Sequence, residues 1–233
     1  MSSAKKPHHR MAGQTMTGAD MVMQVLADEG VDTVFGYSGG AILPTYDAVF
    51  RWNRDNAGKP INLVGPANEQ GAGFMAAGYA RASGKVGVCI VTSGPGATNS
   101  VTPVRDCMAD SVPMVLISGQ VARAAIGTDA FQEAPVFSIM SSCAKHVFLV
   151  KNEEELEATI RTAFHIARSG RPGPVVIDLP KDVQNWHGAY KGEGMLPLPG
   201  YQQRIDALKA AKMSKETARD FFRMLRRSKR PLL

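Results

Sequence analysis

One carboxylate stands at the head of a run of small residues, and this contrast is the first sign of chemistry in the sequence. Residues 66–85 read PANEQGAGFMAAGYARASGK, in which Glu69 precedes mostly glycine and alanine. A helix here would place Glu69 on one face with residues whose side chains are small, namely Gly73, Ala76, Ala77 and Ala80. Such a face allows another helix or a flat ligand to come close, and a desolvated carboxyl group can share a proton with a nitrogen heterocycle. The plainer interpretation is a first-turn glutamate stabilised by the helix dipole.

A serine between glycines is the second candidate for chemistry. Residues 36–40 read GYSGG and match the G-x-S-x-G elbow that presents a nucleophilic serine, here Ser38, between a strand and a helix. A hydrolase also needs a histidine, and of the three downstream only His146 is expected in a suitable loop. The motif follows the first predicted strand, so no earlier loop supplies a second oxyanion donor. A plain turn whose glycines bring backbone N–H groups close to a ligand is therefore favoured, with the hydrolase kept as an alternative.

Phosphate-binding motifs are poorly matched. Residues 92–99, TSGPGATN, follow a predicted strand and open a helix, so their N–H groups could hold an anion. They do not form G-x-G-x-x-G, and no G-K-[ST] occurs in the chain. A dinucleotide site or a P-loop is not expected.

Strands that are apolar throughout alternate with helices along most of the chain. This pattern is typical of α/β proteins in which helices cover both faces of a parallel sheet. Thr17 with Asp20, and Asn152 with Glu155, are expected to begin helices. The predicted strands are 31–35, 61–65, 86–93, 113–118 and 174–180; the predicted helices are 17–29, 41–52, 69–83, 97–109 and 153–169, with a long connection over 119–147.

Changes in amino-acid composition along the chain predict four regions. A flexible tail is expected over 1–15, one domain over 16–185 and a Gly- and Pro-rich linker over 186–203. Residues 204–233 are expected to begin a further domain, with an amphipathic helix that leads into RPLL, which resembles the start of a buried strand. The chain is therefore expected to be the front part of a longer protein.

Charge and composition exclude several classes of protein. The net charge of +6 arises from the two ends, because residues 11–200 carry 14 basic and 18 acidic side chains. A nucleic-acid groove across the folded part is therefore not expected. No apolar run reaches the length of a membrane span, and the first residues lack the apolar region of a secretory signal. Three widely separated cysteines without C-x-x-C argue against disulfides and zinc and favour a reducing cytoplasm.

Seven separate stretches resemble one known family in order and spacing. They cover roughly residues 16–185 and are similar to the thiamine diphosphate enzymes, and among these to the acetolactate (acetohydroxyacid) synthase catalytic subunits. The stretches are VFGYSGGAILPTYDA, NEQGAGFMAAGYARASG, VTSGPGATN, DSVPMVLISGQV, IGTDAFQE, AKHVFLV and SGRPGPVVIDLPKDVQ. The resemblance implies the fold of the pyrimidine-binding domain of that family.

The resemblance also implies a role for Glu69. The family's glutamate hydrogen-bonds N1′ of the aminopyrimidine and favours the imino tautomer, whose 4′-nitrogen removes the proton from thiazolium C2. The carbanion then attacks pyruvate, carbon dioxide leaves, and the remaining two-carbon unit adds to a second 2-keto acid such as pyruvate or 2-ketobutyrate. Cofactor chemistry drives this reaction of branched-chain amino-acid synthesis, while the protein supplies tautomer control and position.

Further positions match family residues that line the site. By resemblance, Ser111 and Gln132 lie at the cofactor, Gly39 and Gly40 lie near the reacting C2, Phe131 and Lys145 lie near substrate, and Arg171 contacts a structural FAD. The Gly-Asp-Gly…Asn signature that holds the diphosphate through magnesium does not occur, so Mg²⁺ ligands are expected outside this chain and no metal site within it. The chain alone is expected to be inactive. Its expected partners are further copies, in a homodimer or homotetramer whose sites straddle subunits, and a regulatory small subunit.

Two positions depart from the family pattern. Asn68 stands where the family often has histidine, and Ser38 where it often has proline. Both lie near the expected chemistry, so use of thiamine diphosphate is a firmer expectation than carboligation of pyruvate. Three alternatives stay open beside the hydrolase: another thiamine diphosphate decarboxylase or carboligase, the pyrimidine-binding subunit of a split enzyme, and a non-catalytic remnant of the fold.

Overall fold

The computed structural model describes residues 9–210 and 212–231. The chain divides into two compact units, of which the first extends to Leu196 and the second begins at Pro197. Most of the expected tail, residues 1–8, and the last two residues of the expected strand RPLL lie outside the described residues.

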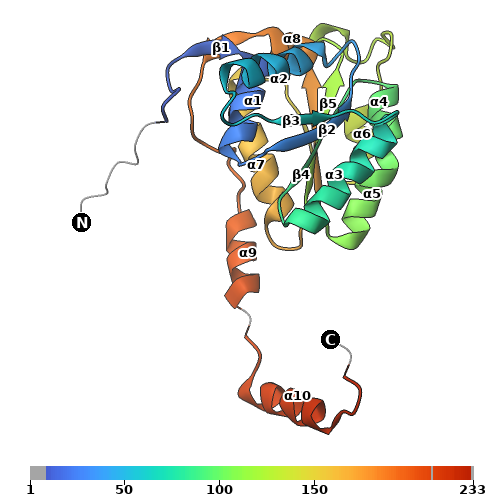
Figure 1. Ribbon diagram of the computed structural model, residues 1–233, viewed down its shortest axis with the longest axis vertical. Helices are drawn as coiled ribbons and strands as arrows, with labels where there is room; N and C mark the ends of the chain where they lie inside the picture. The colour runs from blue at the N-terminus through green and yellow to red at the C-terminus, as the bar shows by residue number, and fades with distance from the viewer. Residues whose placement is uncertain (1–8, 211, 232–233) are drawn as a thin grey trace, which may run out of the picture. The chain divides into compact units, whose positions relative to one another are not determined.

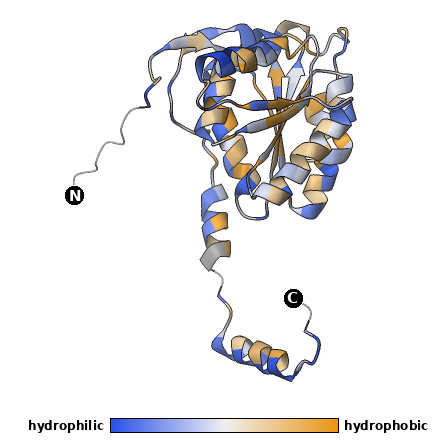
Figure 2. Ribbon diagram, in the orientation of Figure 1, coloured by the Kyte–Doolittle hydropathy of each residue, from blue (hydrophilic) through white to orange (hydrophobic). Residues whose placement is uncertain are grey.

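A six-stranded parallel sheet forms the centre of the first unit (Figure 1). Its strand order is β3-β2-β4-β5-β7-β6. The strands are β2 (Thr33–Tyr37), β3 (Asn62–Val64), β4 (Gly87–Val91), β5 (Met114–Gln120), β6 (His146–Leu149) and β7 (Pro174–Pro180). Every residue of β4, β5 and β7 is buried, and these strands are predominantly apolar in Figure 2. A parallel sheet covered on both faces produces such strands, so the predicted α/β fold is confirmed.

Helices cover both faces of the sheet (Figure 1). One layer contains α1 (Gly18–Asp28), α2 (Leu43–Asp55), α7 (Leu156–Arg168) and α8 (Lys181–Asn185). The other contains α3 (Glu69–Ser83), α4 (Pro95–Asn99), α5 (Val101–Asp110) and α6 (Val136–Ser141). Two short 3₁₀ turns, η1 (Arg123–Ala125) and η2 (Glu153–Glu155), lie in the connections.

Local capping explains where several helices begin and end. The side chain of Thr17 accepts a hydrogen bond from the N–H of Asp20 over 3.0 Å at the start of α1. The side chain of Asn68 accepts from the N–H of Gly71 over 2.7 Å at the start of α3, and Gly84, with φ of +72°, ends that helix. The predicted helix over 69–83 is confirmed with the same bounds.

Two sequence expectations about elements are wrong. The single helix expected over 97–109 is interrupted at Ser100, because Pro103 has no N–H to donate to the carbonyl four residues earlier. The connection expected over 119–147 contains α6 and the start of β6, which adds a sixth strand at one edge of the sheet. Both elements are too short to show a clear hydrophobic period.

A small second sheet ties the start of the described chain to a segment after the last helix of the first unit. Strand β1 (Thr15–Thr17) pairs antiparallel with β8 (His187–Ala189). The N–H of Gly13 donates to the carbonyl of Tyr190 over 2.8 Å, and Nε2 of His9 lies 3.0 Å from Oδ1 of Asp28. Residues 9–15 are thus held on the fold, in contrast to the flexible tail expected over 1–15, and residues 187–189 of the expected linker are paired.

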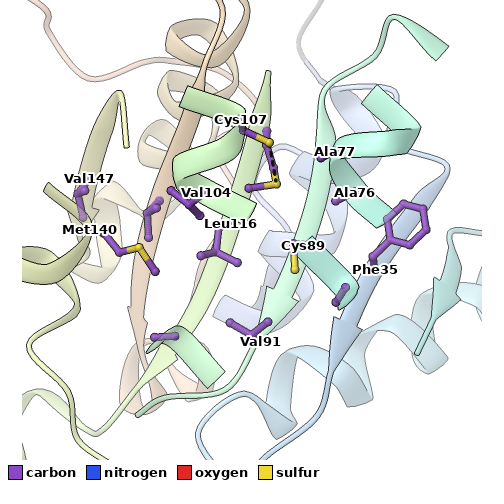
Figure 3. Packing of buried hydrophobic residues seen from close by; sticks show 14 of the residues in the cluster. Phe35, Ala76, Ala77, Cys89, Val91, Val104, Cys107, Leu116, Met140 and Val147 are labelled. Atoms are coloured by element: carbon purple, nitrogen blue, oxygen red, sulfur yellow. Dashed lines mark hydrogen bonds between the residues drawn. The ribbon is translucent and has the colours of Figure 1, made fainter. Parts of the chain in front are cut away.

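The small residues of α3 are packed within the chain. Ala76 and Ala77 lie in the core with Cys89 of β4 and Leu116 of β5 (Figure 3). A Cβ on Gly73 would lie 2.4 Å from Cγ of Pro103 on α5. Of the two partners expected for this face, another helix or a flat ligand, the structure shows the first, because α5 and the sheet cover it.

Two glycines of α3 offer a matched test of this packing. Gly73→Ala is expected to lower the free energy of unfolding by about 1–3 kcal/mol, because the added methyl overlaps Pro103. Gly78→Ala is expected to raise it by roughly 0.5–1 kcal/mol, since a Cβ there meets nothing within 4 Å and alanine favours helix. Urea unfolding of both variants measures the difference, and equal effects would contradict the packing.

The described residues of the second unit, 197–210 and 212–231, form two helices. These are α9 (Tyr201–Ala210) and α10 (Lys215–Arg227), and Ser214 caps α10 by accepting from the N–H of Thr217 over 3.0 Å. The predicted amphipathic helix is confirmed in α10, which has separate apolar and polar sides in Figure 2. None of the helices that the structure describes is long and apolar enough to cross a membrane.

Candidate functional site

The carboxyl ends of the parallel strands bring five of the predicted site residues to one edge of the sheet. Gly39 and Gly40 follow β2, Glu69 begins the helix after β3, and the segment after β5 carries Phe131 and Gln132. In α/β proteins, loops at this edge form the ligand crevice. We call this group the carboxyl-edge site.

Glu69 is nearly buried and only partly bonded. Its side chain is 7% exposed, and its Oε2 accepts a hydrogen bond from Nδ2 of Asn99 over 3.0 Å. Its Oε1 accepts no hydrogen bond from the described part of the chain. A Cβ on Gly96 would lie 3.6 Å from Oε1, so the missing side chain keeps space in front of this oxygen. A carboxylate with one free oxygen can hold an N–H donor of a ligand.

The turn of Gly39 and Gly40 lies close to the loop that follows β4. A Cβ on Gly39 would lie 2.6 Å from the side chain of Thr92, so only glycine allows this approach. The N–H of Ala41 donates to Oγ1 of Thr92 over 3.4 Å. A Cβ on Gly40 would meet nothing within 4 Å, so this glycine faces open space. The turn therefore exposes backbone at the carboxyl-edge site.

Gln132 adopts a backbone conformation that is unfavourable for a residue with a side chain. Its φ is +58°, and a Cβ on Gly94 would lie 2.5 Å from its carbonyl oxygen. Residues in such conformations cost about 1–3 kcal/mol and occur preferentially at functional sites. The neighbouring Phe131 is 89% exposed. The loop therefore presents an aromatic side chain outward from a tightly held backbone.

Two buried residues that hold the loop of Phe131 and Gln132, namely Gln120 and Asp178, are not among the residues predicted from the sequence. Nε2 of Gln120 donates to the carbonyl of Ala134 and to Oδ2 of Asp178, each over 3.1 Å. Oδ1 of Asp178 is buried and has no hydrogen-bond partner among the described residues. Burial raises the pKa of Asp178 to about 7, and the hydrogen bond from Gln120 opposes this rise. The signal in the sequence is a polar side chain, Gln120 or Asp178, within each of two largely apolar runs, VLISGQ and VVIDLP.

The remaining three predicted residues lie at the opposite edge of the sheet. Ser111 precedes β5, Lys145 precedes β6 and Arg171 precedes β7. Nε of Arg171 donates to Oγ of Ser111 over 2.8 Å, and its guanidinium also donates to the carbonyls of Met108 and Ala109. Within one chain the structure does not bring these residues together with Glu69.

Lys145 bonds to backbone carbonyls at the end of α7, as Arg171 does at the end of α5. Its Nζ donates to the carbonyl of Ser169 over 2.6 Å and also to the carbonyl of Ile166. A cation at a helix C-terminus interacts favourably with the exposed carbonyls and with the helix dipole. The contacts within the chain therefore place Lys145 as a helix cap.

The structure also separates the residues of the hydrolase alternative. Ser38 follows the carboxyl end of β2, whereas His146 begins β6 at the amino edge. β2 and β6 are separated by three strands, which corresponds to ~19 Å across the sheet. A serine and its base must lie within hydrogen-bond reach. The expectation that His146 is well placed for Ser38 is therefore wrong.

A comparison with protein families decides the assignment. Residues 16–142 match the model of the thiamine pyrophosphate enzyme N-terminal TPP binding domain. The chain belongs to this family. The matched residues include the whole carboxyl-edge site and Ser111, whereas Lys145 and Arg171 lie beyond them. Thiamine diphosphate, also called thiamine pyrophosphate, is the cofactor of this domain.

Three relatives are acetolactate synthases from different organisms. The chain is 59% identical over 168 residues to the mitochondrial acetolactate synthase catalytic subunit of Saccharomyces cerevisiae, which covers 72% of this chain and 24% of that protein. It is 53% identical over 169 residues to the acetolactate synthase isozyme 2 large subunit of Escherichia coli, covering 72% and 30%. It is 47% identical over 192 residues to the chloroplastic acetolactate synthase of Arabidopsis thaliana, covering 82% and 28%. The chain therefore spans about a quarter to a third of the length of these relatives.

The carboxyl-edge site fits the pyrimidine end of thiamine diphosphate. The ring carries nitrogen atoms that can share a proton with a carboxylate, and Oε1 of Glu69 is the oxygen without a donor in the described chain. Gly96 leaves space beside this oxygen, as a flat ring requires. The described residues contain no group of three or more His, Cys, Asp or Glu that could hold a metal ion.

Proposed function

We propose that the chain acts as the pyrimidine-binding part of an acetolactate synthase catalytic subunit. Such an enzyme decarboxylates pyruvate and joins the remaining two-carbon unit to a second 2-keto acid. The observation that carries the proposal is the nearly buried Glu69, with Oε1 free at a glycine-lined edge. Identities of 47–59% to three acetolactate synthases support this reaction within the family.

Glu69 controls proton position in this proposal. Oε1 of Glu69 holds the proton shared with the pyrimidine nitrogen, and Nδ2 of Asn99 fixes the carboxylate through Oε2. When bound, thiamine diphosphate supplies the carbanion chemistry that decarboxylates a 2-keto acid. The low exposure of Glu69 keeps water from its carboxylate and strengthens the hydrogen bond that this group makes. Gly39 and Gly40 leave room for the reacting end of the cofactor. Gln132 lies at the cofactor, and Phe131 lines the approach of substrate.

The separation of the predicted residues supports a homo-oligomer. We propose that Ser111, Lys145 and Arg171 act at a site shared with another copy of the chain or with a further segment, because they lie at the opposite edge from Glu69. Phe74 and Met75 on α3 are 40% and 41% exposed and provide apolar surface beside the site for such a contact.

Mg²⁺ held by ligands outside this segment, FAD against Arg171, and a regulatory small subunit complete the proposed assembly. Use of the name "large subunit" for the Escherichia coli relative supports the last of these. The cytoplasmic location predicted from the cysteines stays a proposal, since the names of two relatives place those proteins in the mitochondrion and the chloroplast.

A second candidate is another thiamine diphosphate decarboxylase or carboligase, favoured by Asn68 and Ser38, which depart from the family pattern.

Incubation of the native protein, captured from its source cells, with pyruvate, thiamine diphosphate and Mg²⁺ tests the proposed function. Formation of acetolactate is the expected result. Acetaldehyde without acetolactate would favour the second candidate, and cofactor binding without carbon dioxide release would favour a non-catalytic protein. Intact mass above 25.0 kDa would show that the native polypeptide extends beyond this chain.

A further inference from the structure

A buried amide holds the turn at residues 38–41. Gln184 on α8 is completely buried. Its Nε2 donates to the carbonyl of Ala41 over 2.7 Å and to the carbonyl of Leu179 over 3.2 Å. Its Oε1 accepts from Oγ1 of Thr45 over 3.0 Å. Both N–H groups of the amide and its oxygen are thus engaged, so the amide has one orientation.

The same turn is restrained on its other sides by packing. A Cβ on Gly119 of β5 would lie 2.9 Å from the carbonyl carbon and oxygen of Ala41. The side chain of Thr92 lies against Gly39 on the β4 side. These contacts limit how far the turn can move toward the sheet. The bond from Gln184 is the polar contact that holds the Ala41 carbonyl from the side of α8.

We propose that Gln184 is a positioning residue for the carboxyl-edge site. Acting through the carbonyl of Ala41, it fixes the turn of Gly39 and Gly40 and thereby the space between that turn and Glu69. This inference rests on the proposed function in one respect, namely that the space receives the pyrimidine end of thiamine diphosphate. Gln184 itself contacts neither cofactor nor substrate in this arrangement.

Hydrogen exchange of the full chain without cofactor tests the link between Gln184 and the turn. The N–H of Ala41 donates to Thr92, and the N–H of Ile42 donates to the carbonyl of Gly39 over 3.1 Å, so both amides report on the turn. Gln184→Met keeps a similar volume but removes the hydrogen bonds. It should accelerate exchange of these two amides at least ~10-fold while strand amides stay protected.

Matched variants separate this effect from general loss of stability. Gln24→Met is the control, because Gln24 is 7% exposed and donates to Asp28 on α1, far along the chain from the turn. Should Gln184→Met fail to fold, Thr45→Val removes the hydroxyl that orients the amide, and Thr45→Ser should restore it. The measured quantity is the exchange rate of the Ala41 and Ile42 amides. The inference is overturned if Gln184→Met, or Thr45→Val in its place, gives the same rate as Gln24→Met.

Cofactor binding by the native protein provides the second readout. Thiamine diphosphate with Mg²⁺ should raise the thermal midpoint of the wild type and of Gln24→Met alike, and that of Gln184→Met much less. An equal rise in Gln184→Met would overturn the positioning role even if exchange at the turn is faster. No rise in the wild type would instead contradict the proposed function, and the exchange experiment would still decide whether Gln184 holds the turn.

Discussion

Replacement of Glu69 by glutamine is expected to slow acetolactate formation by about 10²–10⁴-fold, the range found when a residue that controls proton transfer is lost. Glutamine keeps the size of the side chain and can still bond to Asn99 through its oxygen. It cannot share a proton with the pyrimidine nitrogen as a carboxylate does. The rate of acetolactate formation by the native protein, with saturating thiamine diphosphate and Mg²⁺, measures the effect.

A control variant and a measurement of thermal stability show whether the effect is specific to Glu69. Glu154→Gln serves as the control and should leave the rate unchanged, because the Glu154 side chain is exposed on η2. This turn follows β6, whereas Glu69 follows β3, and these are the two outermost strands of the sheet. The thermal midpoint of Glu69→Gln without cofactor should remain near that of the wild type, since the buried site loses no packing. A Glu69→Gln variant with wild-type rate would remove the role assigned to this residue.

Asp178 is expected to make the fold less stable as the pH rises toward neutrality. Its pKa is raised by burial from 3.8 to about 7, so the folded chain binds this proton more tightly than the unfolded chain. The resulting stabilisation is complete below the pKa of the unfolded chain and is lost as the pH rises through about 7. Between pH 5 and 7 the free energy of unfolding should fall by up to about 1.4 kcal/mol per pH unit from this group.

Denaturant unfolding at several pH values checks this expectation. Asp178→Asn removes the titrating group and should flatten the pH dependence between pH 5 and 7. Asp182→Asn is the matched control. Burial tends to raise the pKa of Asp182, but the hydrogen bonds and charge of Arg123 outweigh this and lower it, so its own contribution changes only at more acidic pH. The same slope in Asp178→Asn and in the wild type would show that Asp178 does not titrate in this range.

Short-range signals in the sequence predicted individual elements well. The helix predicted over residues 69–83 is α3, and the residues that cap it in the structure, Asn68 and Gly84, are its immediate neighbours in the chain. The sequence predicts β7 at 174–180 because a largely apolar run, here interrupted only by Asp178, forms a strand buried on both faces. The family resemblance, carried by stretches from one end of the domain to the other, is confirmed by the family model over residues 16–142. None of these inferences requires knowledge of distant contacts.

The sequence did not reveal how much of α3 is covered. In the structure, α5 and the sheet lie against Gly73 and the alanines of α3, which leaves no room for larger side chains. The helical pattern shows only that the side chains on this face are small, and not what lies against them. The same limit applies to Ser111 and Arg171, whose mutual hydrogen bond joins residues 60 positions apart. Only the folded chain shows that this pair and Glu69 occupy opposite edges.

The sequence by itself determined the fold class, most helix and strand positions and the family, and it singled out Glu69, the carboxylate on which the proposed chemistry depends. These follow from capping, periodicity and motifs, in which the interacting groups are neighbours along the chain. The tertiary structure alone decided which residues share a site, that Asp178 is buried with Gln120, and that Gln184 holds the glycine turn. The contacts of Asp178 and Gln184 span 58 and 143 positions, and burial and hydrogen bonding over such separations depend on strand order and layer packing, which no local pattern encodes.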